Sequence, residues 1–111
     1  MQKQQIIVSL TSFPQALPFC VQAIRSILEG SVLPDKIVLY LTAQQFPSGK
    51  IPSYLEDLLT LNTFFEVRFY NQVIRSYTKL IPAIQDFPND IIITIDDDVR
   101  YHKNMLKHLL S

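Results

Sequence analysis

Apolar residues along this chain occur in two patterns, short unbroken runs and sets spaced three to four residues apart. Four short runs rich in β-branched and aromatic residues predict strands, at 5–11, 36–41, 64–70 and 90–96. The helically spaced sets predict helices at 20–28, 52–62, 76–87 and 103–110. Because strands and helices alternate, we expect an α/β domain with parallel neighbouring strands and right-handed crossovers.

The strand candidates differ in their internal pattern, and this difference predicts their places in the sheet. The runs at 5–11 and 90–96 are almost continuously apolar, which is typical of buried central strands, whereas 64–70 alternates and suggests an edge. We expect the order 3-2-1-4, with helices on both faces of a Rossmann-like parallel sheet. Gly30 is expected to end the first helix, and 90–96 to be fully buried.

Three consecutive aspartates follow the last predicted strand, in the sequence IIITIDDDVRY at 91–101. Ligands of such sheets bind beyond the carboxyl ends of the strands. Asp96 and Asp98 can point the same way, about 6–7 Å apart, where they would repel by roughly 2–3 kcal/mol. A divalent cation such as Mg²⁺ or Mn²⁺ would offset this repulsion. The structural alternative is an exposed acidic turn that caps the last helix.

Composition and charge narrow the class of protein. The chain has 111 residues, of which 48% are hydrophobic, and its ten basic and ten acidic residues cancel. This predicts one globular unit over 1–111 and argues against nucleic-acid binding. The single Cys20 is interpreted as a buried, reduced thiol. We see no signal-peptide pattern and no apolar run of about 20 residues. We therefore expect a cytoplasmic protein, with attachment at the inner membrane surface left open.

Four segments occur in an order that carries a family resemblance: IIVSLTSFPQ, SILEGSVLPDKIVLYL, SYTKLIPAI and IIITIDDDVRY. Together they resemble the nucleotide-sugar-binding half of a GT-A-fold glycosyltransferase, similar to family 2. The resemblance implies that an Asp-x-Asp motif holds Mn²⁺ or Mg²⁺ on the donor diphosphate. Asp98 would be a metal ligand, Asp96 would hold metal or ribose, and Asp97 would lie near the ribose or diphosphate. It also implies a glycan or lipid-linked acceptor and a place in polysaccharide biosynthesis.

The resemblance suggests further donor contacts. Thr11 would hydrogen-bond the base or ribose, and Phe13 would either stack on the base or pack on the core at the helix entry. Arg75 and Lys79 could face the diphosphate, with a solvated helix face as the alternative. In the family, an acidic residue that contacts the nucleotide base often follows the second strand. This sequence has neutral residues there, namely Thr42, Gln44 and Gln45, so the identity of the base is not predicted.

No Asp or Glu follows Asp98 in this sequence, so we expect the catalytic base to lie outside these residues. We therefore interpret 1–111 as a donor-binding half, excised or truncated, that is inactive alone and prone to self-association through its sheet edge. A phosphotransferase of the haloacid dehalogenase type is one alternative, although Arg100 departs from that motif. A non-catalytic interaction module is another. His102 is interpreted as a surface residue more readily than as a ligand.

Overall fold

A computed structural model describes residues 4–46, 49–62, 64–70, 81–97 and 99–110. Its four strands form one sheet in the order β3-β2-β1-β4, and every neighbouring pair is parallel. The strands are β1 (Ile6–Ser12), β2 (Lys36–Thr42), β3 (Phe65–Tyr70) and β4 (Ile91–Thr94). The predicted strand order and the parallel arrangement are confirmed.

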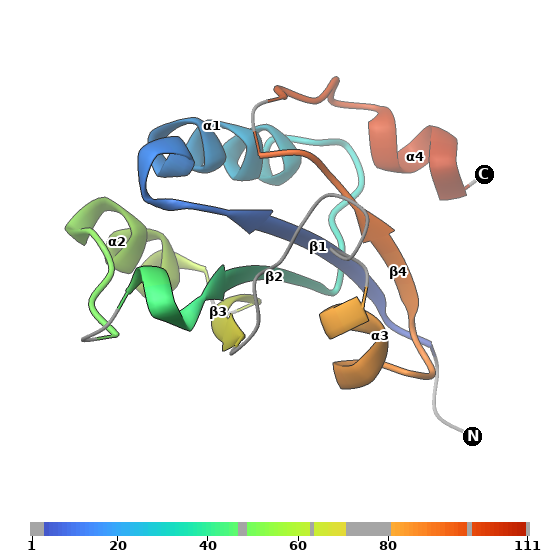
Figure 1. The fold of residues 1–111 in the computed structure, drawn as a ribbon. Coiled ribbons are helices and arrows are strands. Elements are labelled where there is room, and N and C mark those ends of the chain that lie inside the picture. The colour runs from blue at the N-terminus through green and yellow to red at the C-terminus, as the bar shows by residue number, and fades with distance from the viewer. Residues whose placement is uncertain (1–3, 47–48, 63, 71–80, 98, 111) are drawn as a thin grey trace.

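Helices cover both faces of the sheet (Figure 1). They are α1 (Leu17–Leu28), α2 (Ser53–Leu61), α3 (Ile81–Asp86) and α4 (Met105–Leu110), with single 3₁₀ turns η1 (Pro14–Ala16) and η2 (Ala43–Gln45). Side chains of α1, α2 and α4 share one core with alternate residues of β1 and β2. On the opposite face, Ala83 of α3 packs with Ile7, Val38 and Tyr40. Within the described part of the chain, no helix combines the length and apolar character needed to cross a membrane.

The helix that follows β1 begins earlier than its apolar spacing predicted. The chain makes the turn η1 and enters α1 at Leu17, with Pro18 in the first helical turn, where a missing backbone donor is tolerated. One face of α1 is then buried from Leu17 through Cys20 and Ile24 to Ile27. A helix is predicted for 76–87, and the structure has α3 at Ile81–Asp86 within this range. Residues 76–80 lie outside the described part of the chain.

Gly30 follows the end of α1 as predicted, but the reason for a glycine is different from the expected one. Its φ is not positive; among the described glycines only Gly49 has a positive φ, at 68°. A Cβ on Gly30 would lie 3.0 Å from the carbonyl oxygen of Ile27 and 3.2 Å from that of Lys103. The backbone N–H of Ser31 also donates to the Lys103 carbonyl, at 2.7 Å. Gly30 therefore permits close approach of the segment that follows β4.

The strand predicted at 90–96 to be fully buried is shorter and more exposed than expected. β4 covers Ile91–Thr94; Ile91 is 40% exposed and the next three residues are half-buried. Among the described residues, β4 pairs with β1 on one side and with no strand on the other. An apolar run reports hydrophobicity but not how many neighbours a strand has, which is why the prediction of full burial is wrong.

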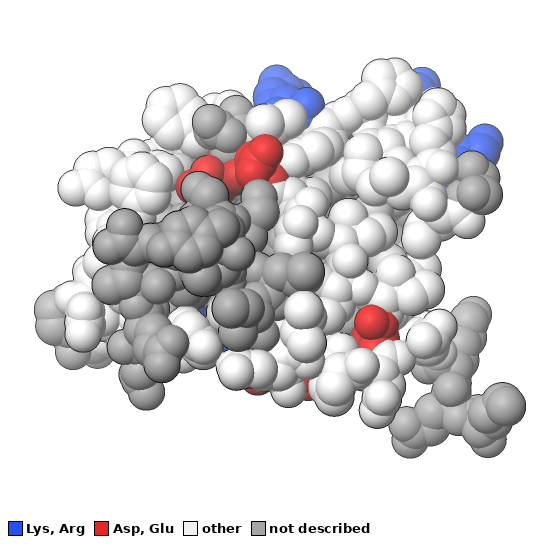
Figure 2. Space-filling model, turned by 45° about the vertical axis from the view of Figure 1, so that its right-hand side comes forward, with Lys and Arg blue, Asp and Glu red and all other residues white. Residues whose placement is uncertain are grey.

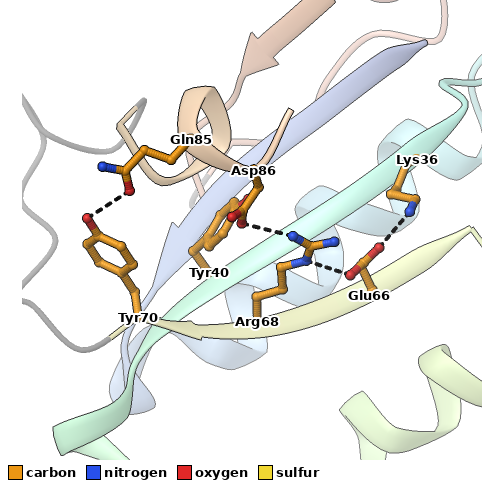
Figure 3. Close-up of polar contacts among 7 residues, drawn as sticks. All are labelled: Lys36, Tyr40, Glu66, Arg68, Tyr70, Gln85 and Asp86. Carbon is orange, nitrogen blue, oxygen red and sulfur yellow. Dashed lines mark hydrogen bonds and ion pairs between the residues drawn. The ribbon is translucent and has the colours of Figure 1, made fainter. Parts of the chain in front are cut away.

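A cluster of charged and hydroxyl groups joins α3 to β2 and β3 (Figure 3). Arg68 contacts two carboxylates, with Nε 2.7 Å from Glu66 and Nη1 2.9 Å from Asp86. Lys36 Nζ lies 2.8 Å from the other oxygen of Glu66, and the buried Tyr40 hydroxyl donates to Asp86 at 2.8 Å. We call these residues the α3 network: Lys36, Tyr40, Glu66, Arg68 and Asp86.

The α3 network is balanced internally. Burial opposes ionisation of Glu66, but hydrogen bonds from Arg68 and Lys36 outweigh burial and lower the pKa of Glu66. Burial, followed by its hydrogen bond to Asp86, raises the pKa of Tyr40. Beneath the cations, the Phe87 ring centroid lies 4.8 Å from the Arg68 guanidinium carbon and 5.5 Å from Lys36 Nζ. The cluster therefore has the features of a structural contact that secures α3.

Candidate functional site

The carboxyl ends of the four strands meet at one edge of the sheet because all four strands are parallel. The strand order reverses beside β1, since β2 and β3 lie on one side of it and β4 lies on the other. In open α/β sheets, ligands bind beyond the strand ends at this reversal. The two segments that meet here are the TSFP turn (11–14), at the end of β1, and the acidic turn (95–97), which follows β4.

A hydrogen bond joins these two segments across 85 positions of sequence. The hydroxyl of Ser12 donates to Oδ2 of Asp97 at 2.8 Å. Ser12 is 8% exposed and lies on the same face of β1 as Val8 and Leu10, because strand side chains alternate. Asp97 is half-buried. The Asp97 carboxylate is therefore held against the end of β1.

The buried thiol of Cys20 lies beside this pair. Burial raises the pKa of Cys20 to about 12, with a smaller contribution from the negative charge of Asp97, while the proximity of the Ser12 hydroxyl acts in the opposite direction. A thiol with so high a pKa is uncharged at neutral pH and is a poor nucleophile. The prediction that Cys20 is a buried, reduced thiol agrees with its surroundings.

A second hydrogen bond holds the residue before Asp97. The backbone N–H of Asp96 donates to the hydroxyl of Tyr101 at 2.8 Å. The backbone N–H of Tyr101 donates in turn to Oγ of Ser26 at 2.9 Å, and the buried Ser26 hydroxyl donates to the Ala23 carbonyl within α1. Asp96 is exposed. The acidic turn is thus tied to β1 through Asp97 and to α1 through Tyr101.

Other predicted donor contacts lie at the same edge. Thr11 is half-buried near the end of β1, and Phe13 is 47% exposed between β1 and η1. Phe13 belongs to neither hydrophobic cluster of the described residues, which argues against the alternative that it packs on the core. At the end of β2, Thr42 is buried, whereas the two glutamines of η2 are exposed; these are Gln44 and Gln45.

Three predicted residues lie outside the described part of the chain: Arg75, Lys79 and Asp98. Their roles stay predictions. His102 is described and exposed; its Nδ1 accepts the backbone N–H of Asn104 at 3.1 Å, and its carbonyl accepts that of Met105. His102 therefore acts locally at the start of α4, which agrees with its interpretation as a surface residue.

The chemistry of the acidic turn suits a hard divalent cation. Carboxylate oxygens are the ligands that Mg²⁺ and Mn²⁺ prefer, and Mg²⁺ commonly uses only one or two of them. The described residues, which leave out Asp98, contain no group of three or more His, Cys, Asp or Glu that could hold a metal. Figure 2 shows a group of acidic atoms exposed in the upper half of one face of the molecule. Of the two described aspartates in the acidic turn, Asp96 is the exposed one, as expected of a metal ligand.

An open groove of about 540 Å³ lies between β4 and α4. It is lined mainly by apolar atoms, and its residues include Ile93, Tyr101, Met105 and Leu109. It adjoins the acidic turn through Ile95. The side of β4 that pairs with no strand among the described residues, together with this groove, is the surface on which the prediction of self-association depends.

Reasoning from the sequence missed three residues of this site, namely Ser12, Ser26 and Tyr101. Ser12 lies inside the TSFP turn, so the turn was selected but this serine was not. Tyr101 ends the segment IIITIDDDVRY but has no assigned role there, and Ser26 lies on the buried face of α1. A polar residue on an otherwise apolar helix face is a usable signal for such a partner, because buried hydroxyls are almost always hydrogen-bonded.

Comparison with known proteins shows a likeness to a solved structure. No family model and no curated protein sequence matches this chain. The crystal structure of S. aureus TarS, residues 1–349, superimposes with a TM-score of 0.67 at 10% sequence identity, covering 96% of this chain and 31% of the TarS chain. TarS is a glycosyltransferase. The chain therefore shares its α/β fold with part of TarS and spans less than a third of the TarS chain in that structure; membership of family 2 stays a prediction.

Proposed function

We propose that this chain is the donor-binding part of a glycosyltransferase, which binds a nucleotide-sugar diphosphate through a divalent metal ion. The observation that carries the proposal is the Ser12–Asp97 hydrogen bond at 2.8 Å, because it brings the TSFP turn and the acidic turn together where the strand order reverses. The glycosyltransferase-like fold supports the same assignment.

Within this proposal, Asp96 and Asp98 hold Mn²⁺ or Mg²⁺. When bound, the cation supplies Lewis-acid stabilisation of the negative charge on the leaving nucleoside diphosphate. Thr11 donates or accepts a hydrogen bond at the base or ribose, and the half-exposed ring of Phe13 offers a stacking surface. Lys79 provides a positive charge for the diphosphate.

The remaining functions belong to the proposed whole protein. The whole protein would bind a glycan or lipid-linked acceptor, and a general base would remove the proton of the acceptor hydroxyl. A cytoplasmic location, at or near the inner membrane surface, is part of the same proposal. So is a role in polysaccharide biosynthesis.

Calorimetric titration of residues 1–111 with UDP, GDP, ADP and inorganic phosphate tests the proposal. Each ligand is titrated with Mn²⁺ and again with EDTA. We expect one nucleoside diphosphate to bind in Mn²⁺ and to lose at least about tenfold in affinity in EDTA, because metal and diphosphate bind as a unit. Inorganic phosphate should bind much more weakly.

The alternatives give different outcomes in the same experiments. An acid-stable or beryllofluoride-trapped aspartyl-phosphate would indicate a phosphotransferase of the haloacid dehalogenase type. Failure of every nucleotide to bind, with and without Mn²⁺, would contradict donor binding and favour an interaction module.

A further inference from the structure

Two hydrogen bonds hold consecutive residues of the acidic turn. Ser12 donates to the Asp97 carboxylate at 2.8 Å, and the Asp96 backbone N–H donates to the Tyr101 hydroxyl at 2.8 Å. The two anchors come from opposite ends of the described chain and approach the turn from different elements. Each anchor is itself fixed, Ser12 by its place in β1 and Tyr101 by the bond from its backbone to Ser26 of α1.

From this arrangement we infer that Ser12 and Tyr101 are positioning residues for the donor site, and that Asp97 acts through its bond to Ser12 and not as a metal ligand. The inference rests on the proposed function and deepens it. It distinguishes the two described aspartates, with Asp97 directed to the protein and Asp96 at the surface.

The burial of the two described aspartates supports this division. Asp97 is half-buried, and its charge is close enough to the buried Cys20 to contribute to the raised pKa of that thiol. Its carboxylate therefore lies on the α1 side of the sheet. Asp96 is exposed and precedes Asp97 directly. The hydrogen bond from Ser12 and the difference in burial therefore distinguish Asp97 from Asp96.

Preorganisation is the physical reason why the anchors affect binding. Adjacent carboxylates repel, and an unrestrained turn would separate them by changing its backbone angles. A ligand that needs one arrangement would then have to immobilise the turn, which weakens binding. One anchor lies on a strand and the other is hydrogen-bonded to a helix through Ser26, so both restrain the turn before the ligand arrives.

The test compares the affinity for UDP and GDP in Mn²⁺ across a set of variants of the 111-residue chain. Ser12→Ala removes the donor and should weaken Mn²⁺-dependent binding roughly tenfold, the factor that one hydrogen bond to a charged group represents. Ser12→Thr keeps a hydroxyl and should bind within about threefold of wild type. Asp97→Ala should match Ser12→Ala, and the double variant should be no worse, because both remove the same bond. Tyr101→Phe should also weaken binding.

Ser9→Ala is the matched control for Ser12→Ala. Ser9 is a buried serine of the same strand, and among the described residues its hydroxyl has no hydrogen-bond partner. Its removal should leave the affinity unchanged. Asp97→Asn keeps an acceptor for Ser12 and should retain most of the binding, whereas Asp96→Asn should lose nearly all of it. Unfolding in urea, measured on each variant, separates loss of binding from loss of folding.

Three results would overturn the inference while the proposed function stands. These are wild-type affinity in Ser12→Ala, additive losses in the Ser12→Ala and Asp97→Ala double variant, and a loss in Asp97→Asn as complete as in Asp96→Asn. Absence of binding by the wild-type chain to both nucleotides would instead overturn the proposed function, and this inference with it. The expected result is weak binding by Ser12→Ala and Asp97→Ala, restored by Ser12→Thr.

Discussion

The α3 network and the acidic turn are both clusters of ionisable groups beside the sheet, but their charges are composed differently. In the α3 network two cations, Lys36 and Arg68, meet the carboxylates of Glu66 and Asp86 at 2.7–2.9 Å. In the acidic turn two carboxylates are adjacent in sequence, and the hydrogen bond shown to the Asp97 side chain comes from a neutral hydroxyl. The first cluster pairs opposite charges, and the second concentrates charge of one sign.

This difference separates a structural cluster from a candidate functional one. A balanced cluster needs nothing from outside the protein, and it secures α3 by satisfying its own charges. A cluster of carboxylates is costly unless a counter-charge compensates it. Both clusters are held by equally short hydrogen bonds, so geometry alone would not distinguish them. The sign balance does.

The largest expected effect concerns the reactivity of Cys20 beside the acidic turn. With a pKa of about 12, Cys20 is ionised to about one part in ten thousand at pH 8, against about one part in ten at its ordinary value of 9.0. The native chain should therefore react with DTNB about a thousandfold more slowly than the urea-unfolded chain. Stopped-flow absorbance measures both rates. Native labelling within tenfold of the unfolded rate would contradict the burial of Cys20 in the folded chain.

The next largest expected effect is a loss of ligand binding when Asp98, a metal ligand in the proposed site, is substituted. Asp98→Asn should reduce Mn²⁺-dependent nucleotide binding by at least about a hundredfold, since even second-shell partners of a metal are worth about 10- to 100-fold. The unfolding free energy should rise slightly, because carboxylate repulsion falls. Asp57→Asn, at an exposed position on α2, is the matched control. If Asp98→Asn lowered the unfolding free energy and left Mn²⁺-dependent binding unchanged, the alternative that the aspartates cap the last helix would be favoured.

Substitutions in the α3 network should lower the unfolding free energy and leave Mn²⁺-dependent nucleotide binding unchanged. Arg68→Ala removes contacts to Glu66 and Asp86 and the contact with the Phe87 ring. We expect a loss of about 1–2 kcal/mol in unfolding free energy; the Arg68 side chain is 35% exposed, so solvent screening reduces the value. Urea denaturation measures it, with Arg25→Ala on the exposed face of α1 as control. A loss of Mn²⁺-dependent binding in Arg68→Ala would break the distinction between the two clusters.

The smallest expected effect is the pH dependence of the α3 network. The pKa of Glu66 is lowered from its ordinary value of 4.5 on folding. Its contribution to stability is therefore complete above pH 4.5 and decreases as the pH falls through the lower value of the folded state. The difference in unfolding free energy between wild type and Glu66→Gln should be below about 1 kcal/mol. It should be constant near neutral pH and shrink in acid; a difference that grows in acid would contradict the assignment.

Much of the fold follows from the hydrophobic pattern. The four apolar runs predicted four strands in the observed order, and the alternating run at 64–70 correctly indicated an edge strand. Placing the TSFP turn and the aspartates at one edge needed only the rule that parallel strands end on the same side. The prediction for 90–96 was wrong about burial, because edge and central strands can have the same apolar composition.

The contacts that complete the candidate site were not predictable in the same way. Ser12 and Asp97 are 85 positions apart, and Tyr101 and Ser26 are 75 positions apart. Helical or strand periodicity reports neighbours within a few residues, so it does not identify such partners. The α3 network has the same character: Tyr40 reaches Asp86 over 46 positions. Gly30 is a related case, since its lack of a side chain is explained by the approach of Lys103.

By itself, the sequence determined the type and order of the elements, the location of three carboxylates after the fourth strand, and the sign of their charge. These properties depend on local periodicity and on composition, which one chain displays directly. Only the tertiary structure decided that Asp97 contacts Ser12, that Tyr101 holds the Asp96 backbone, and that β4 has an unpaired side among the described residues. The physical reason is that these contacts depend on how the crossovers pack α1 and the segment after β4 against the sheet, and that packing is a property of the whole fold.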